Sequence, residues 1–246
     1  MRNITIMLLT TVLLLMLSVG IGVSYYQQSP SRDELVIVVH GLARSDNAMW
    51  LIETRLANAG YDVCLLDYKT IGQDSQLLFA DTEQQIARCL NGQKTHFVGH
   101  SLGGLVIKNF LNKSSSHNNI ADLGEVVFVG TPNHGSEVAD ALRDHYIMTL
   151  GGDVTQSLMQ GSDTLGRQVG KNTIPVGVIA GTKSNPLTAK YFTAANDGFV
   201  SVESTKLANM KDFITLPVGH SAMRYDGEVA TQIMHFLENG QFHHRN

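Results

Sequence analysis

Ser101 stands between two glycines in the pentapeptide Gly99-His100-Ser101-Leu102-Gly103. A strand is expected before it at Thr95 to Gly99, with Phe97 and Val98 apolar, and a helix is expected after it as far as about Leu111. A sharp strand-to-helix turn demands both glycines, because side chains there would collide. The turn exposes the serine hydroxyl and places the Leu102 N–H at a helix N-terminus, which favours a developing anion. The pattern predicts a nucleophilic serine; a purely structural turn is the alternative.

Segments with strand and helix character alternate along most of the chain. The β-branched run Leu35 to His40 is typical of a strand that is buried on both faces. Further strands are expected at Tyr61 to Tyr68, Glu125 to Val129, Ile174 to Ala180 and Phe213 to Leu216, and helices at Asn47 to Asn58, after Asp74 or Asp81, and at Glu228 to Glu238. The alternation predicts an α/β fold with a mostly parallel central sheet flanked by helices. In such sheets the active site lies at the carboxyl ends of the strands.

The segment from Gly135 to Asn172 breaks this alternation. It contains several glycines and scattered apolar residues but no strand pattern, and it is long for a connection in a compact domain. We expect a lid-like insertion over residues 136–173, with an ordinary pair of surface helices as the alternative. The apolar stretch from Ile147 to Met159 would suit an acyl-chain pocket, because methionine adapts to irregular apolar ligands.

Five motifs between about Leu35 and Leu237 resemble those of the α/β-hydrolase superfamily, and specifically its small lipase- and esterase-like members, including bacterial triacylglycerol lipases and inositol-deacylase-type lipases. These motifs are Val38-Val39-His40-Gly41-Leu42, Gly60-Tyr61-Asp62-Val63, Phe97-Val98-Gly99-His100-Ser101-Leu102-Gly103-Gly104, Gly130-Thr131-Pro132-Asn133-His134-Gly135-Ser136 and Asn196-Asp197-Gly198-Phe199-Val200. The resemblance implies the α/β-hydrolase fold and a catalytic serine, acid and histidine in that chain order. It also implies hydrolysis of carboxylic esters through an acyl-enzyme; we expect no cofactor and no metal ion.

The same chain order selects the base and the acid. His220 follows the last expected strand, in a loop after Gly219, where the resemblance places the general base. His134, which also follows a strand end, is the main alternative. Asp197 precedes Gly198 and resembles the acid turn of the family, so it would accept a hydrogen bond from the His220 ring. Glu203 is the alternative acid.

The His40-Gly41 pair at the end of the first strand resembles the oxyanion loop of the family. The backbone N–H groups of Leu42 and Leu102 would then bind the oxyanion, and each such donor contributes about 2.7–4 kcal/mol in comparable sites. We expect a structural role for the His40 side chain. Amides or thioesters are alternative substrates, and a non-catalytic scaffold that binds a lipid or a partner is the alternative from another functional class.

The beginning of the chain has the composition of a membrane segment. Ile4 to Val23 is almost entirely apolar, and no charged side chain lies between Arg2 and Arg32. As a helix it would span roughly 30 Å at about 1.5 Å per residue, enough to cross a bilayer core. We expect residues 1–28 to anchor the protein, with a cleaved signal peptide as the alternative. Arg2 favours a cytoplasmic N-terminus, so the catalytic domain, residues 33–240, would lie on the periplasmic or extracellular side.

Composition narrows the remaining functional classes. The 246 residues suit one α/β domain, and the formal net charge of −4, without a long run of one sign, lacks the basic footprint of nucleic-acid binding. Cys64 and Cys89 either pair in an oxidising compartment or remain two buried thiols. Their spacing does not suggest a metal site. The expected partners are therefore an ester or lipid substrate and a membrane.

Overall fold

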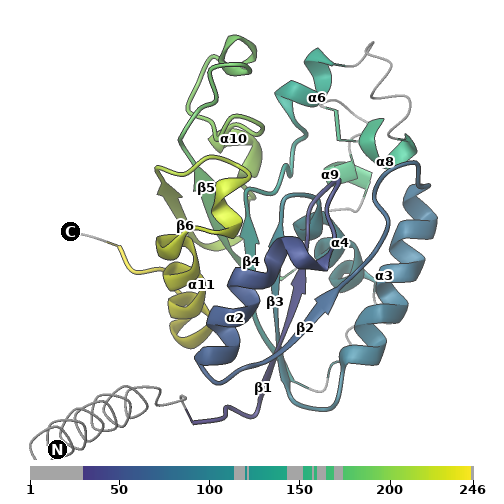
Figure 1. The fold of residues 1–246 in the computed structure, drawn as a ribbon, viewed down its shortest axis with the longest axis vertical. Coiled ribbons are helices and arrows are strands. Elements are labelled where there is room, and N and C mark those ends of the chain that lie inside the picture. The colour runs from purple at the N-terminus through teal and green to yellow at the C-terminus, as the bar shows by residue number, and fades with distance from the viewer. Residues whose placement is uncertain are drawn as a thin grey trace, which may run out of the picture.

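The computed structural model describes residues 30–113, 120, 122–142, 152–156, 158–159, 165–168 and 174–244. At its centre lies a six-stranded sheet with the strand order β2-β1-β3-β4-β5-β6 (Figure 1). All neighbouring strands pair in parallel. The strands are β1 (Glu34–Val39), β2 (Asp62–Leu66), β3 (Lys94–His100), β4 (Leu123–Val129), β5 (Val176–Gly181) and β6 (Met210–Leu216). The predicted α/β architecture is thus confirmed.

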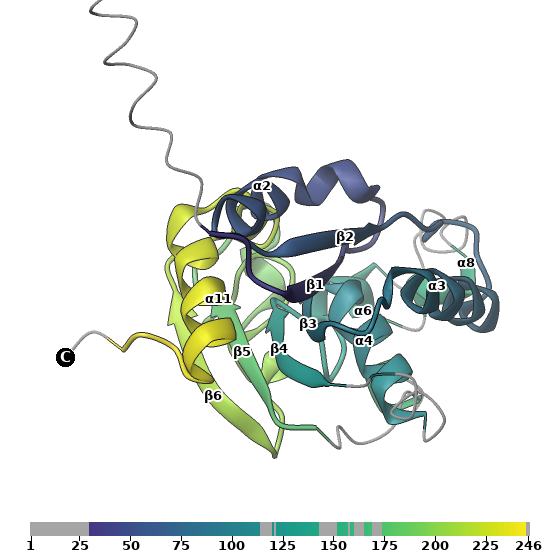
Figure 2. The same cartoon turned by 90° about the horizontal axis from the view of Figure 1, so that it is seen from below.

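Helices cover both faces of this sheet (Figure 2). The helices α2 (Trp50–Asn58) and α11 (Gly227–Asn239) pack on one face, and α3 (Ser75–Cys89) and α4 (Leu102–Asn112) pack on the other. Along β1, Val36 and Val38 belong to the core beneath α2 and α11, whereas Ile37 and Val39 belong to the core beneath α3 and α4. Burial on both faces explains why the sequence of β1 is continuously apolar.

Side-chain caps set the ends of the two longest helices. The Asp74 carboxylate accepts hydrogen bonds from the N–H groups of Gln76 and Leu77, so α3 begins after Asp74 rather than after Asp81. Asp226 caps α11 in the same way. Gly240 ends α11 with a left-handed backbone (φ 68°) that glycine adopts without steric cost.

The described residues of the segment expected to be lid-like contain three short helices: α6 (Glu137–Ala141), α8 (Gly152–Gln156) and α9 (Leu165–Gln168). Val154, Leu158 and Leu165 are buried in the core cluster on the α4 side. The described part of this segment therefore packs against the domain. Residues 147–151 of the stretch expected to suit an acyl-chain pocket lie outside the described residues, and the acyl-chain pocket stays a prediction. Movement of residues 136–173 as a lid stays a prediction.

The expected anchor, residues 1–28, lies outside the described residues. In the ranges that the structure does describe, no helix has the length and apolar character needed to cross a membrane. The remaining short helices are η1 (Asp46–Met49), η2 (Ala189–Tyr191), α10 (Val202–Thr205) and η3 (Ala222–Arg224).

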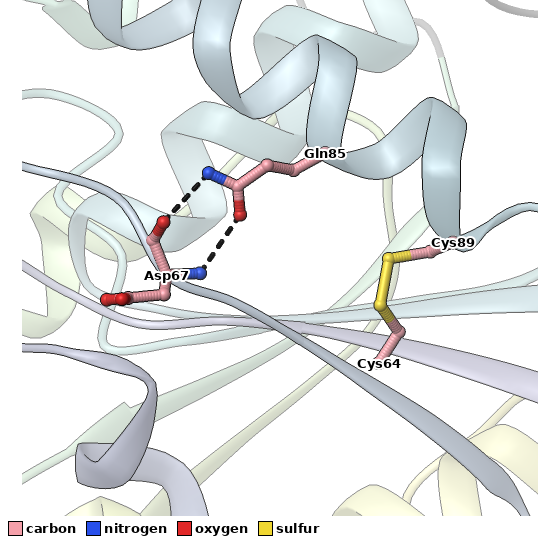
Figure 3. The surroundings of a disulfide bond; sticks show 4 residues. All are labelled: Cys64, Asp67, Gln85 and Cys89. Atoms are coloured by element: carbon pink, nitrogen blue, oxygen red, sulfur yellow. Dashed lines mark hydrogen bonds between the residues drawn. A yellow bond between two sulfur atoms is a disulfide. The ribbon is translucent and has the colours of Figure 1, made fainter.

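Cys64 of β2 and Cys89 of α3 form a disulfide bond (Figure 3). Of the two interpretations that the sequence left open, the structure therefore has the paired one. The bond connects the second strand directly to the helix that covers it, and it closes a loop with a sequence separation of 25 residues.

Candidate active site

Ser101 occupies the tight turn between β3 and α4. Its backbone has φ 55° and ψ −123°, a positive φ that residues other than glycine rarely adopt. A Cβ atom added to Gly99 would lie 2.6 Å from the Gly104 nitrogen, and one added to Gly103 would lie 2.2 Å from the Val39 carbonyl oxygen. Because these neighbours are backbone atoms, the turn requires glycine at both positions, as the pattern predicted.

Ser101, His220 and Asp197 form a chain of hydrogen bonds at the carboxyl ends of the strands. The Nε2 atom of His220 lies 3.0 Å from Ser101 Oγ, and its Nδ1 atom lies 2.7 Å from Asp197 Oδ2. A carboxylate only accepts, so Nδ1 carries the proton and Nε2 is free to accept the serine proton. The structure thus brings together the three side chains that the sequence singled out.

The Asp197 carboxylate is fixed by its own loop. The side chain is buried, and Oδ1 accepts hydrogen bonds from the N–H groups of Phe199 (2.9 Å) and Val200 (2.7 Å). The backbone oxygen of Asp197 accepts from the His220 N–H at 2.8 Å. A Cβ atom at Gly130 would lie 3.3 Å from both Asp197 Oδ2 and His220 Nδ1. The loop therefore leaves Asp197 Oδ2 as the oxygen that accepts from the His220 ring, and Gly130 leaves little free space around this contact.

His100 supports His220 from the nucleophile turn, a contact that sequence reasoning did not find. Its Nε2 atom donates to the His220 carbonyl oxygen at 3.0 Å, and the two rings are 4.9 Å apart between centroids. Burial, and then the neighbouring His220, hold the pKa of His100 well below its ordinary value, so this ring is neutral. The only sequence signal for this contact is the position next to Ser101.

The two alternative residues lie elsewhere. His134 is exposed in the loop after β4, where its N–H donates to the Ser204 carbonyl oxygen. Glu203 lies in the first turn of the short α10, and its exposed carboxylate pairs with Lys206 at 2.8 Å. Geometry therefore favours His220 over His134 as the partner of Ser101, and Asp197 over Glu203.

The two expected oxyanion donors border Ser101. Leu102 is the first residue of α4, so its N–H has no acceptor within the helix. Leu42 follows Gly41, which packs so closely on the turn that a Cβ atom there would lie 2.9 Å from Ser101 Cβ. In the described part of the chain, no acceptor for the Leu42 N–H is found. Both N–H groups are thus available, and their oxyanion role stays a prediction.

A pocket of about 240 Å³ contains the Ser101 hydroxyl and is lined by Gly41, Leu42, Ala43, Arg44, His100, Ser101, Phe199, His220 and Ser221. The His40 side chain lies outside this pocket and stacks on Tyr68, with 4.2 Å between the ring centroids. This packing agrees with the structural role expected for His40. Within the described ranges, no group of three or more histidine, cysteine or acidic side chains is arranged to hold a metal ion.

Several solved structures are similar to this chain. A lipase from Bacillus licheniformis in its propeptide form has a TM-score of 0.67 at 21% identity, and the match covers 89% of this chain and 53% of that one. The mature form of that lipase has a TM-score of 0.60 at 20% identity, and the match covers 86% of this chain and 92% of that one. A metagenomic carboxyl esterase has a TM-score of 0.60 at 16% identity, and the match covers 79% of this chain and 67% of that one. At these identities the likeness concerns the fold, and this chain spans about half of the propeptide form.

No curated protein matches the chain. One family does match, over residues 84–240, and it is described as "Alpha/beta hydrolase of unknown function (DUF915)". The matched residues make up more than half of the chain and include the β3–α4 turn with Ser101, the Asp197 loop and the His220 loop. The parallel sheet, the strained turn and this match agree, and the chain belongs to this family of α/β hydrolases.

Proposed function

We propose that this protein is a serine hydrolase that cleaves carboxylic esters through an acyl-enzyme intermediate. The observation that carries the proposal is the hydrogen-bonded chain from Ser101 Oγ through the His220 ring to Asp197 Oδ2. Two unpartnered N–H groups beside Ser101, those of Leu42 and Leu102, further support acyl transfer. The ester class is supported by membership in an α/β-hydrolase family and by the shared fold with lipases and a carboxyl esterase.

In this mechanism Ser101 Oγ attacks the ester carbonyl carbon while His220 Nε2 takes the serine proton. The N–H groups of Leu42 and Leu102 donate to the oxygen that becomes negative. When the tetrahedral adduct collapses, its bond to the alcohol oxygen breaks and His220 protonates that oxygen. His220 then removes a proton from water, whose oxygen attacks the acyl carbon on Ser101. When this second adduct collapses, its bond to Ser101 Oγ breaks, Oγ takes the proton back from His220, and the carboxylic acid is released. Asp197 keeps the imidazole in the required tautomer and stabilises the imidazolium form.

Hydrolysis of p-nitrophenyl esters by active-site variants tests this proposal. Ser101→Ala is expected to abolish turnover, because no other group can form the acyl-enzyme. Asp197→Asn is expected to lower kcat by about 10⁴-fold, as the equivalent change does in a protease triad. Glu203→Gln serves as the matched control, because this exposed acid pairs with Lys206 and should leave kcat unchanged.

Equal hydrolysis by Ser101→Ala and the wild type would reject the proposal. Full activity of Asp197→Asn together with an inactive Glu203→Gln would assign the role of the triad acid to Glu203 of α10 instead of Asp197. Esters of increasing chain length, compared with emulsified lipid and with matched amides and thioesters, then define the substrate class. Failure of the pure protein to hydrolyse any of them would favour a binding scaffold.

We further propose that the catalytic domain lies on the extracytoplasmic side of a membrane, held by residues 1–28. The apolar run from Ile4 to Val23 supports an anchor. The disulfide between Cys64 and Cys89 supports an oxidising compartment, because such compartments are where disulfides form and persist. Cleavage of the domain by protease added to spheroplasts, whose outer envelope has been removed, is the expected result, and protection until the spheroplasts are lysed would contradict this location.

A further inference from the structure

A second and larger hollow lies beside the Ser101 pocket. This cleft of about 1120 Å³ lies past the carboxyl ends of β1 and β2. Ala43 and Arg44 line both the cleft and the Ser101 pocket, so the loop after β1 forms a wall that the two share. A substrate bound at Ser101 that extends past Ala43 therefore enters the cleft.

Arg224 of η3 supplies the most unusual group in the cleft wall. The residue is only 4% exposed, and its Nε atom is buried without a hydrogen-bond partner. Its Nη1 atom donates to the Ala48 carbonyl oxygen (3.3 Å) and to the Tyr225 hydroxyl (3.1 Å). Within the described residues, no carboxylate pairs with the guanidinium. An arginine side chain stays protonated in proteins, so a buried positive charge here lacks a counter-charge.

A second cation lies near Arg224. Burial lowers the pKa of the Arg224 guanidinium, the neighbouring Tyr225 partly raises it, and the charge of Arg44 lowers it further, so the two arginines repel each other. The same two charges act on His100 next to Ser101, whose pKa is lowered first by burial and by His220 and then by Arg224 and Arg44. Arg44 lines the Ser101 pocket together with His100 and lines the cleft together with Arg224, so the arginine pair lies beside the nucleophile turn.

The other charged side chains of the cleft do not neutralise this pair. Lys69, Asp67 and Asp81 complete the charged lining. The Asp81 carboxylate accepts a hydrogen bond from Gln85 Nε2 at 3.2 Å. Figure 3 shows the Asp67 carboxylate pointing away from Gln85, and no ion pair between it and a cation is found in the described ranges. The cleft thus has three cations against two acids, with the arginines unpaired.

The cleft wall is held in place by specific contacts. The Gln85 amide bridges the backbone of Asp67, accepting from its N–H at 3.0 Å and donating to its carbonyl oxygen at 2.8 Å (Figure 3). The Ala43 N–H donates to the buried Thr70 hydroxyl at 2.9 Å, which ties the shared wall to the segment after β2. Because these contacts hold the cleft wall before a ligand binds, binding of a ligand costs little conformational entropy of the wall.

We propose that Arg224 and Arg44 bind an anionic group of the substrate, a carboxylate or a phosphate, so that the preferred esters are acidic ones. This inference rests on the proposed function, because it assigns the part of the ester that lies beyond Ser101. The planar guanidinium fork matches the oxygens of carboxylates and phosphates and binds them with charge-assisted hydrogen bonds. The anion supplies the counter-charge that the buried Arg224 lacks.

Matched pairs of esters test this assignment and separate the two anions. The first pair is mono-p-nitrophenyl glutarate against p-nitrophenyl pentanoate, and the second is a 1-acylglycerol 3-phosphate against the 1-monoacylglycerol. For the wild type we expect kcat/KM to favour the anionic member of at least one pair by about tenfold or more. Added salt should reduce the preference contributed by the exposed Arg44.

Arg224→Gln and Arg44→Gln should remove the preference by raising KM for the anionic ester by a larger factor than KM for the neutral ester. Arg55→Gln is the matched control, because Arg55 also donates to a backbone carbonyl oxygen, that of Asp226 (2.7 Å), but does not line the cleft. If Arg224→Gln does not fold, the exposed Arg44→Gln variant carries the test. Equal losses for the anionic and neutral esters, or no wild-type preference in either pair, would overturn the inference.

A binding measurement separates this inference from the proposed function. The Ser101→Ala protein is titrated with glutarate and with inorganic phosphate, and its melting temperature is followed. A rise that Arg224→Gln or Arg44→Gln abolishes supports the anion site even if no ester is turned over. The absence of any rise, together with no preference for acidic esters, would remove the anion site while leaving Ser101 chemistry intact.

Discussion

Two neighbouring loops at the same edge of the sheet are held in place by different means. The β3–α4 turn with Ser101 depends on backbone packing, where an added Cβ atom at Gly99 or Gly103 would meet main-chain atoms. The strand β2 and the segment after it, which forms a wall of the cleft, depend on side chains instead: the disulfide joins Cys64 of β2 to α3, and the Gln85 amide holds the Asp67 backbone (Figure 3). Each loop lines one of the two adjoining hollows in which we propose that the substrate binds, but only the turn presents the proposed nucleophile.

The difference indicates a division between chemistry and recognition. Close backbone packing fixes Ser101 Oγ and tolerates almost no change, as an attacking atom requires. Side-chain contacts allow the cleft wall to change residue by residue while the turn stays intact. We therefore expect changes in the turn to reduce turnover of all esters, and changes in the wall to affect stability and selectivity.

Gly103→Ala should have the largest effect. Its Cβ atom would lie 2.2 Å from the Val39 carbonyl oxygen, so the turn must shift, and a displacement of about 1 Å can cost about 100-fold in rate. We expect kcat/KM to fall by about that factor for neutral and acidic esters alike, as measured by steady-state kinetics. Gly92→Ala is the control: its φ of 88° is also positive, but no atom lies within 4 Å of the new Cβ atom. Gly92→Ala should cost about 1 kcal/mol of stability and leave kcat/KM intact.

Replacement of both cysteines tests the wall. Cys64→Ser with Cys89→Ser should lower the free energy of unfolding by about 3 kcal/mol, because the disulfide closes a loop with a separation of 25 residues. Urea unfolding measures this loss, and kcat for a neutral ester at low temperature should stay near the wild-type value. A variant that unfolds like the wild type but loses kcat would reverse the proposed division between the two loops.

A smaller, pH-dependent effect is expected behind the turn. Lys108 of α4 is buried, and its Nζ atom donates to the Gly166 carbonyl oxygen at 2.7 Å. Burial lowers the pKa of Lys108 from 10.5 to about 8. The unfolded chain therefore binds more protons between these values, and stability should rise as the pH increases from about 8 to about 10.5. In Lys108→Met this contribution is missing, so the stability difference between the two proteins should change over that window and stay constant below it.

Local patterns predicted most of the fold. The continuous apolar run of β1 and the alternation of strands with helices follow from burial on both faces of the sheet, which sequence records directly. The start of α3 stayed open between Asp74 and Asp81, because both are good caps, and only the structure selects Asp74. The anchor and the lid movement remain predictions.

The site was predictable only in part. The meeting of Ser101, Asp197 and His220 was predictable, because the glycines around the turn single out Ser101 and the family resemblance implies the chain order of acid and histidine. The His100 contact, the cysteine pairing and the unpaired Arg224 depend on which loops meet in space, and η3 reaches the cleft from the far end of the chain. Spacing along the sequence contains no such information.

Covalent labelling of Ser101 tests the central claim most directly. The folded protein is treated with a fluorophosphonate, and the modified residue is located by peptide mass spectrometry. We predict a single adduct on Ser101, absent from Ser101→Ala and formed more slowly by His220→Ala, because the imidazole activates the hydroxyl. No adduct on the folded protein, or equal labelling of Ser101→Ala, would contradict the assignment of Ser101 as an activated nucleophile.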